Sequence, residues 1–179
     1  RLEPNDNQFI YDAVAHHCVQ VATHRHGCCV MQRCIDHSSN QQKMQLVEEI
    51  KNNALSLVQD QFGNYVVQYV LDLGMESVCE ALATNLLGHL YFLSTQKFSS
   101  NVVEKCLKVG NAATVQMMSK ELAEFQTDPL HPVFPQTPND DPLICLLQHP
   151  FGNYVVQTAL QVAQIKAAKE WNQIAARIK

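Results

Sequence analysis

Apolar side chains recur at spacings of three and four residues along most of the chain, with polar side chains between them. One such run extends from residue 46 to residue 58, and another from residue 82 to residue 93. The first run contains the apolar residues Leu46, Val47, Ile50, Ala54, Leu57 and Val58. This spacing places apolar side chains on one face of an α-helix, whereas a half-buried strand would alternate them at every second position. The pattern therefore predicts an all-α fold.

The pattern also repeats along the chain. Four segments resemble one another, and they read RHGCCVMQRCID (25–36), QFGNYVVQYVLD (61–72), KFSSNVVEKCLK (97–108) and PFGNYVVQTALQ (150–161). The third position of each segment is small, namely Gly27, Gly63, Ser99 and Gly152, at successive steps of 36, 36 and 53 residues. A fixed period of roughly 20–50 residues is typical of proteins built from stacked structural repeats. The excess of 53 over 36 indicates an insertion of 17 residues in the last unit.

Each unit is predicted to be a pair of helices, and stacked pairs bury the apolar face that a single pair would expose. We expect units at about 1–38, 39–74, 75–110 and 111–161, followed by a C-terminal helical cap at 162–179. Five of the seven prolines lie between residues 129 and 142, which predicts a loop insertion at 126–141. Gly74 and Gly110 follow two of the predicted helices, where a C-capping glycine belongs. Because the first unit begins so close to Arg1, we expect its outer face to be open and further repeats to be missing before it.

Polar side chains interrupt the second helix of each unit at fixed positions. The first, second and fifth residues after the small one form the triplets Cys28, Cys29 and Gln32; Asn64, Tyr65 and Gln68; Ser100, Asn101 and Glu104; and Asn153, Tyr154 and Gln157. The outer two members of a triplet are four residues apart, so they share one helical face. Stacking the units places these faces in a row. One polar pair per helical repeat is the arrangement with which repeat proteins bind one nucleobase each.

These motifs resemble those of the Pumilio/FBF (PUF) family of RNA-binding proteins, whose variants include G-N-Y-V-V-Q, S-N-V-V-E and G-C-x-V-x-Q. The resemblance extends over about residues 9–161, and the ATHRHGCC stretch is similar to fungal members. It implies a right-handed α-solenoid of Pumilio-type repeats, here the last four of the family's usual eight. It also implies sequence-specific binding of single-stranded RNA, with one base per repeat.

The family's recognition code, applied to the four pairs, gives a base for each unit. The expected pairs are Asn64 with Gln68 and Asn153 with Gln157 for uracil, Ser100 with Glu104 for guanine, and Cys28 with Gln32 for adenine. The chemistry fits, because amides match the donor and acceptors of uracil, a carboxylate accepts N1–H and N2–H of guanine, and a Gln amide matches N1 and N6 of adenine. Members of this family bind RNA antiparallel to the protein chain, so the implied core is 5′-UGUA-3′.

The middle residue of each triplet is expected to stack on the bases. Tyr65 and Tyr154 are aromatic platforms, each contributing about 1–3 kcal/mol per stacked base. Asn101 is usual in the guanine repeat of the family. Cys29 offers little stacking area, so we expect adenine to be bound more weakly than the other three bases.

The resemblance further implies a cytoplasmic protein that binds 3′ untranslated regions of messenger RNA and represses them. Deadenylation and translational-repression proteins are the implied partners, with the 126–141 loop as a candidate docking segment. We expect no catalysis, no cofactor and no metal, and neither DNA binding nor association with a membrane.

The charge of the chain bears on whether RNA would be bound through its phosphates or through its bases. Its 13 Lys and Arg against 17 Asp and Glu give a formal net charge of −4 among 179 residues. Proteins that coat nucleic acid neutralise phosphates with many basic side chains. An acidic chain is poorly suited to that mode, so the sequence favours contacts with exposed bases and a shallow dependence of affinity on salt. No run of about 18 apolar residues exists, which excludes a membrane-spanning helix.

Two alternatives stand beside RNA binding. The first is a protein-binding solenoid of the armadillo or HEAT kind, whose repeats lack a fixed polar triplet. The second is a zinc site or an enzyme, suggested by the crowding of His16, His17, Cys18, His24, His26, Cys28, Cys29, Cys34 and His37. No C-x₂-C pair, glycine-rich phosphate loop or H-E-x-x-H motif occurs among them, and an odd total of seven cysteines argues against a secreted disulfide framework.

Overall fold

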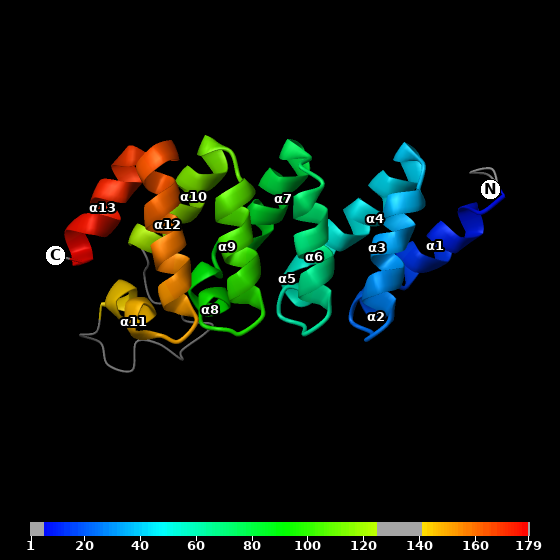
Figure 1. The fold of residues 1–179 in the computed structure, drawn as a ribbon, viewed down its shortest axis with the longest axis horizontal. Helices are drawn as coiled ribbons and strands as arrows, with labels where there is room; N and C mark the ends of the chain where they lie inside the picture. Colours follow the sequence, from blue (N-terminus) through cyan, green and yellow to red (C-terminus); the bar gives the residue numbers. More distant parts are fainter. Residues whose placement is uncertain (1–5, 125–140, 179) are drawn as a thin grey trace.

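A computed structural model describes residues 6–124 and 141–178 of the chain. These residues form thirteen helices and no strand, arranged as an elongated stack with the termini at opposite ends (Figure 1). The helices are α1 (Gln8–His16), α2 (Cys18–Ala22), α3 (Gly27–His37), α4 (Asn40–Asn52), α5 (Ala54–Leu57), α6 (Gly63–Asp72), α7 (Glu76–Leu86), α8 (Leu90–Ser94), α9 (Ser99–Val109), α10 (Ala112–Glu124), α11 (Pro142–Gln148), α12 (Gly152–Lys166) and α13 (Ala168–Ile178). The prediction of an all-α solenoid is confirmed.

The repeating unit is a set of three helices, so the expectation of a helix pair was wrong. Units 1 to 4 are α1–α3, α4–α6, α7–α9 and α10–α12, and the middle helix of each is short. The apolar run from 46 to 58 is divided at Asn53, whose side chain donates a 2.8 Å hydrogen bond to the Glu49 carbonyl. The run from 82 to 93 is divided near Gly88, which has a φ of +84°. A left-handed residue cannot continue an α-helix, so the chain turns there although the apolar periodicity continues.

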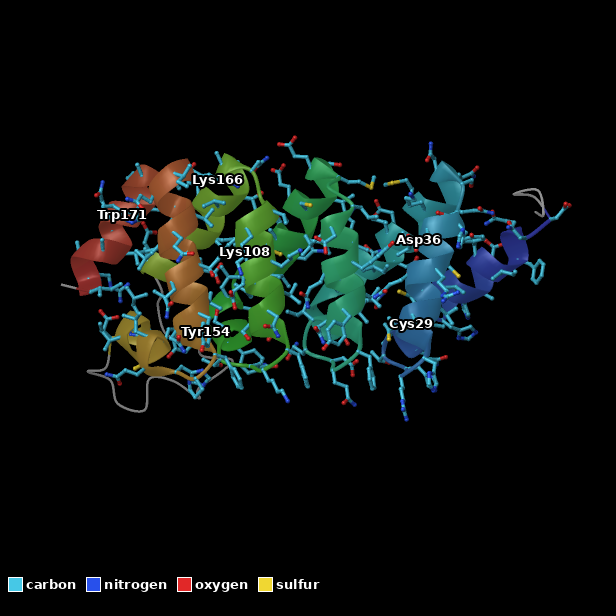
Figure 2. The ribbon with its side chains drawn as sticks, in the orientation of Figure 1. Cys29, Asp36, Lys108, Tyr154, Lys166 and Trp171 are labelled. Atoms are coloured by element: carbon cyan, nitrogen blue, oxygen red, sulfur yellow. The ribbon has the colours of Figure 1, made fainter. Side chains whose placement is uncertain are left out.

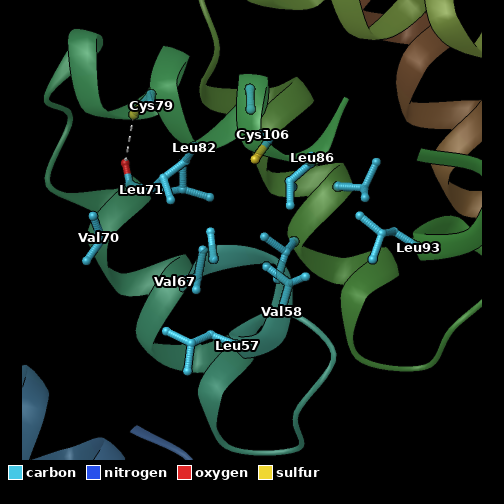
Figure 3. Close-up of a cluster of buried hydrophobic side chains, with 14 of the residues drawn as sticks. Leu57, Val58, Val67, Val70, Leu71, Cys79, Leu82, Leu86, Leu93 and Cys106 are labelled. Atoms are coloured by element: carbon cyan, nitrogen blue, oxygen red, sulfur yellow. Dashed lines mark hydrogen bonds between the residues drawn. The ribbon is translucent and has the colours of Figure 1, made fainter. Parts of the chain in front are cut away.

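The third helices α3, α6, α9 and α12 lie side by side along one face, and we refer to them as the recognition helices (Figure 1). Behind them runs a second row made of α1, α4, α7, α10 and α13. A continuous core fills the space between these rows and the short helices. Figure 3 shows part of this core, in which side chains from α5, α6, α7, α8 and α9 meet, among them Leu57, Val58, Val67, Leu82, Leu86, Leu93 and Cys106. The rows therefore fix the spacing of the recognition helices.

Most apolar positions of the recognition helices are buried. Val66, Val102 and Val155 are 0% exposed, but Val30, which has the same position in α3, is 48% exposed. Cys34 is also only partly buried. The reason is that α3 packs against a recognition helix on one side only, α6, whereas α6 and α9 each lie between two. Equivalent residues are thus buried or exposed according to how many neighbours their helix has.

The small residue that begins each recognition helix is required by close packing against the short helix. A Cβ atom on Gly63 would lie 2.7 Å from the Leu57 carbonyl oxygen. Ser99 occupies this position in unit 3, where its hydroxyl donates a 2.7 Å hydrogen bond to the Leu93 carbonyl. Gly74 has the expected left-handed conformation, with a φ of +67°. Gly110 does not, because its φ is −62°; there a glycine is favoured by close packing, since a Cβ atom would lie 2.7 Å from the Cys106 carbonyl oxygen.

The C-terminal helices cover the end of the stack next to unit 4. Helix α12 extends to Lys166, and α13 packs against both α10 and α12. Ile174 is fully buried, and Trp171 packs against the cluster of Val115, Ala163 and Ala167, whereas Ile165 is 85% exposed. Of the predicted 126–141 insertion, residues 126–140 lie outside the described part of the chain. Within the described ranges, no helix is both long enough and apolar enough to span a membrane.

Candidate nucleic-acid interface

The four predicted triplets all lie near the beginning of the recognition helices, at equivalent positions. Figure 2 labels Cys29 and Tyr154 close to the ends at which α3 and α12 begin. The first member of a triplet is buried in units 1 to 3, where Asn64 is only 2% exposed, and is partly buried in unit 4. The middle member faces outward, so that Tyr65 and Tyr154 are each 58% exposed. Because the recognition helices are neighbours, the triplets form one row along the stack.

The two Asn/Gln pairs have the same hydrogen-bonded structure. The Asn64 side-chain nitrogen donates to the backbone carbonyls of Asp60 and Gln61, at 2.8 and 3.1 Å. Its Oδ1 accepts a 3.0 Å hydrogen bond from Nε2 of Gln68. Asn153 donates to two carbonyls in the same way, and its Oδ1 accepts from Nε2 of Gln157 at 3.1 Å. The Asn amide thus orients the Gln amide, which keeps Oε1 and one N–H for a ligand.

The Ser100 and Glu104 pair presents a carboxylate at the position held by glutamine elsewhere. Ser100 is 4% exposed, and the side chain of Glu104 is 17% exposed. Oε2 of Glu104 accepts hydrogen bonds from Nζ of Lys108 at 3.0 Å and from the Thr158 hydroxyl at 3.1 Å. A carboxylate accepts hydrogen bonds only, so this position suits a ligand edge that offers donors.

The Cys28 and Gln32 pair has fewer hydrogen bonds to its surroundings than the other pairs. The Cys28 thiol points toward the Arg25 carbonyl at 3.5 Å, and burial raises the pKa of this thiol, so it remains protonated at neutral pH. Among the described residues, no side-chain hydrogen bond fixes Gln32, in contrast to Gln68 and Gln157. Cys29 is exposed beside the pair and offers little area to a base.

A hollow in the surface spans α6, α9 and α12 at the level of the Ser100 and Glu104 pair. It is lined by Asn64, Tyr65, Lys97, Phe98, Ser100, Asn101, Glu104, Phe151 and Tyr154. The exposed tyrosines of units 2 and 4 lie on either side of Asn101, which belongs to unit 3. Planar ligands can therefore stack on tyrosine while their edges face the polar pair.

The turns before α3, α6 and α12 contain capping residues whose role the repeat pattern did not predict. Nδ1 of His24 and of His149 accept hydrogen bonds from two backbone N–H groups at 3.2 and 3.3 Å, and Oδ1 of Asp60 accepts two at 2.8 Å. Burial lowers the pKa of His149, which favours the neutral imidazole that this acceptor role requires. Their position three residues before the small residue was a signal that could have identified them.

Two of the basic side chains near the interface, Lys105 and Lys108, are paired with acidic ones. Lys105 forms a 2.5 Å ion pair with Asp72, and Lys108 binds Glu104. Lys97 lies 5.5 Å from the centre of the Phe98 ring. Among residues 6–124 and 141–178, no three His, Cys, Asp or Glu side chains are grouped to hold a metal ion. The crowded histidines and cysteines of unit 1 are therefore spread over the three helices and the turns between them.

These features define a class: an α-solenoid of three-helix repeats that presents one polar pair and one stacking residue per repeat. A family model described as the Pumilio-family RNA binding repeat matches residues 17–51, 53–87, 89–123 and 145–166. The chain belongs to the Pumilio family of RNA-binding repeat proteins. This family is non-catalytic, and the match decides against the armadillo and HEAT alternative.

Similar proteins support the same assignment. A Pumilio domain-containing protein of Schizosaccharomyces pombe is 45% identical over 170 residues, which are 95% of this chain and 23% of that protein. Pumilio homolog 9 of Arabidopsis thaliana is 42% identical over 163 residues, or 91% of this chain and 26% of its own length. The solved Puf4 RNA binding domain, bound to the HO endonuclease RNA 3′ UTR recognition sequence, has a TM-score of 0.82 at 34% identity and covers 99% of this chain. The chain spans 52% of that domain and about a quarter of the two curated relatives.

Proposed function

We propose that this chain binds single-stranded RNA sequence-specifically, with one base on each recognition helix and a core of 5′-UGUA-3′. The observation that carries the proposal is the row of polar pairs on α3, α6, α9 and α12, each beside an outward-facing residue. Only one of the four pairs contains a carboxylate, so the row offers different chemistry at different positions. A surface that bound RNA by charge alone would not need such differences.

The hydrogen-bonding capacity of each pair supports the base that we propose for it. Gln68 and Gln157 each keep an acceptor and a donor, which match N3–H and a carbonyl oxygen of uracil. Glu104 accepts from N1–H and N2–H of guanine. Gln32 matches N1 and N6 of adenine, with the small Cys28 beside it. Tyr65, Tyr154, Asn101 and Cys29 are the exposed residues that we propose to contact the faces of the bases.

In the cell, we propose that the bound RNA is the 3′ untranslated region of messenger RNA and that binding represses it in the cytoplasm. The Puf4 neighbour was solved with a 3′ UTR recognition sequence, which supports this choice of ligand. Deadenylation and translational-repression proteins are the proposed partners, and residues 126–141 are a proposed docking segment. A reporter messenger RNA carrying UGUA in its 3′ untranslated region should be repressed more than one carrying UCUA.

A double substitution tests the recognition code directly. The variant S100N/E104Q gives α9 the same pair as α6 and α12, so preference at the second base should change from guanine to uracil. Affinities for UGUA and UUUA oligonucleotides, measured by fluorescence anisotropy, should exchange their order. If the variant still prefers UGUA to UUUA, the assignment of bases to units is wrong.

A matched control uses the second row of helices. Glu80 and Thr84 are also four residues apart, on the exposed face of α7. The control variant T84N/E80Q makes the same change of charge and introduces the same two amide side chains. It should leave the order of the two affinities unchanged.

A further inference from the structure

The carboxylate of Glu104 is held by two side chains that lie outside the predicted triplets. Its Oε2 atom accepts hydrogen bonds from the Thr158 hydroxyl at 3.1 Å and from Nζ of Lys108 at 3.0 Å. Thr158 belongs to the next recognition helix, α12, and is only 5% exposed. Lys108 belongs to α9 itself, and its side chain is 55% exposed. Glu104 therefore has a partner on its own helix and a buried partner on its neighbour.

This arrangement departs from the other two junctions between recognition helices. Where α3 meets α6, the Tyr69 hydroxyl donates to Asp36, and where α6 meets α9, Lys105 forms an ion pair with Asp72. Tyr69 and Lys105 have the repeat position of Thr158, and Asp36 and Asp72 have the repeat position of Lys108. At those two junctions, the contact joins these two repeat positions to each other. It does not involve the glutamine of the proposed base-binding pair.

At the junction of α9 and α12, both of these repeat positions hold a different kind of residue from the other two junctions. A lysine stands in place of aspartate, and a short hydroxyl stands in place of a long side chain. Both now contact Glu104, whose own position is the only one of the four that is acidic. The three residues that differ from the repeat pattern thus lie in one cluster and are joined by hydrogen bonds.

The cluster leaves one face of the carboxylate free. Both donors are directed to Oε2, whereas Oε1 accepts no hydrogen bond from another described side chain. A carboxylate has about four lone-pair positions, so capacity for N1–H and N2–H of guanine remains. Two fixed donors also restrict the rotation of the Glu104 side chain, and that ordering no longer has to occur when the base binds.

We propose that Thr158 and Lys108 are positioning residues for Glu104, so that selectivity for guanine depends on α12 as well as on α9. This proposal rests on the proposed function, because it assumes that Glu104 contacts guanine. Thr158 directly follows Gln157, the proposed uracil-binding residue of unit 4. The sites for the first two bases are therefore joined through adjacent residues of α12.

The substitution T158V removes the hydroxyl and keeps the size of the side chain. The test compares the affinities of each variant for UGUA, UAUA and UUUA oligonucleotides, together with its melting temperature. The ratio of the UAUA and UGUA dissociation constants should fall about fivefold in T158V, because the carboxylate loses one of the two hydrogen bonds that position it while its contact with the base remains. T158S keeps a hydroxyl and should retain the ratio of the unmodified chain. K108M should lower the ratio by a smaller factor, because Lys108 is largely exposed and such ion pairs are weak.

The outcomes separate the positioning role from a merely structural one. If T158V weakens binding of all three oligonucleotides equally, or leaves the ratio unchanged, Thr158 does not position Glu104 and the proposal fails. An unchanged ratio in K108M removes Lys108 from it. T84V, which removes a hydroxyl bonded to the Glu80 carbonyl on α7, is the matched control and should retain the ratio.

The same experiment distinguishes failure of this proposal from failure of the proposed function. The unmodified chain and E104Q are measured alongside. If the unmodified chain does not prefer UGUA, guanine recognition itself is wrong. If it does, and E104Q abolishes the preference while T158V does not, only the positioning role is overturned.

Discussion

The recognition helices α9 and α3 follow the same repeat pattern but differ in how their neighbours hold them. Helix α9 lies between α6 and α12, its apolar positions are buried, and Glu104 has two hydrogen-bond partners. Helix α3 has only α6 beside it, Val30 is exposed, and Gln32 has no side-chain partner among the described residues. The comparison shows that the repeat pattern places a polar pair on both helices, whereas the hydrogen bonds that hold the pair differ between them.

The largest expected effect is a loss of base selectivity when the polar pair of α9 is altered. The same kind of change on α3 should cost less selectivity. E104A removes the acceptors for two guanine donors, so the preference for UGUA over UAUA should fall at least about tenfold. Q32A removes a side chain that is not held in place, and preference at the fourth base should fall only about threefold. Competition binding with oligonucleotides varied at each base measures both. Equal losses in the two variants would contradict the comparison.

The next effect concerns stability at one repeat position. V66A should lower the free energy of unfolding by about 2 kcal/mol, because Val66 is fully buried and a cavity would remain. V30A alters the equivalent side chain on α3, which is 48% exposed, so it should cost about 0.5 kcal/mol or less. Urea denaturation followed by circular dichroism measures both values. A cost for V30A as large as that for V66A would show that α3 is held as firmly as α6.

Stacking should differ between the two ends of the interface. Y154A should weaken binding of UGUA by about 1–3 kcal/mol, since Tyr154 offers an exposed ring to a base. C29A should have almost no effect, and C29Y should strengthen binding toward the value that a stacked tyrosine contributes. Isothermal titration calorimetry of the three variants checks this order. Weaker binding by C29Y would mean that Cys29 does not face a base.

A smaller effect is expected from pH, through the turn before α12. Burial lowers the pKa of His149, so the unfolded chain takes up a proton at a higher pH than the folded chain. The contribution of His149 to stability is therefore complete above about pH 6.5, the ordinary value for histidine, and is lost as the pH falls below it. H149D copies the acceptor that Asp60 provides before α6.

The melting temperature of the unmodified chain should fall more steeply between pH 7.5 and pH 5.5 than that of H149D. The reason is that an aspartate in this turn stays charged throughout that range. Parallel curves for the two proteins would remove His149 as the source of the effect.

The smallest expected effect is that of salt on RNA affinity. Lys105 and Lys108 are already paired with Asp72 and Glu104, and the net charge of the chain is −4. Few counterions are then released, and the slope of log K against log salt should be no steeper than about −1.5. A titration between 50 and 300 mM salt measures it, and a slope near −5 would indicate binding dominated by phosphate contacts.

Much of this architecture follows from the sequence because the repeat positions are local. The spacing of Gly27, Gly63, Ser99 and Gly152 located all four recognition helices, and the polar triplets were found at their expected ends. The short helices were missed because apolar periodicity continues through Asn53 and Gly88, where the backbone turns. The exposure of Val30 depends on which helices are neighbours, and no spacing along the chain reports that. The contact between Thr158 and Glu104 was missed for the same reason, since its partners are 54 residues apart.

The central claim is that each recognition helix contacts one base through its own polar pair. Its most direct test is a binding series in which UGUA is changed at one base at a time and every affinity is measured at the same salt concentration. We predict that every change weakens binding, most strongly at guanine, which faces the held carboxylate of Glu104, and least at adenine, which faces Gln32. Equal affinity for UGUA and UCUA would contradict the claim.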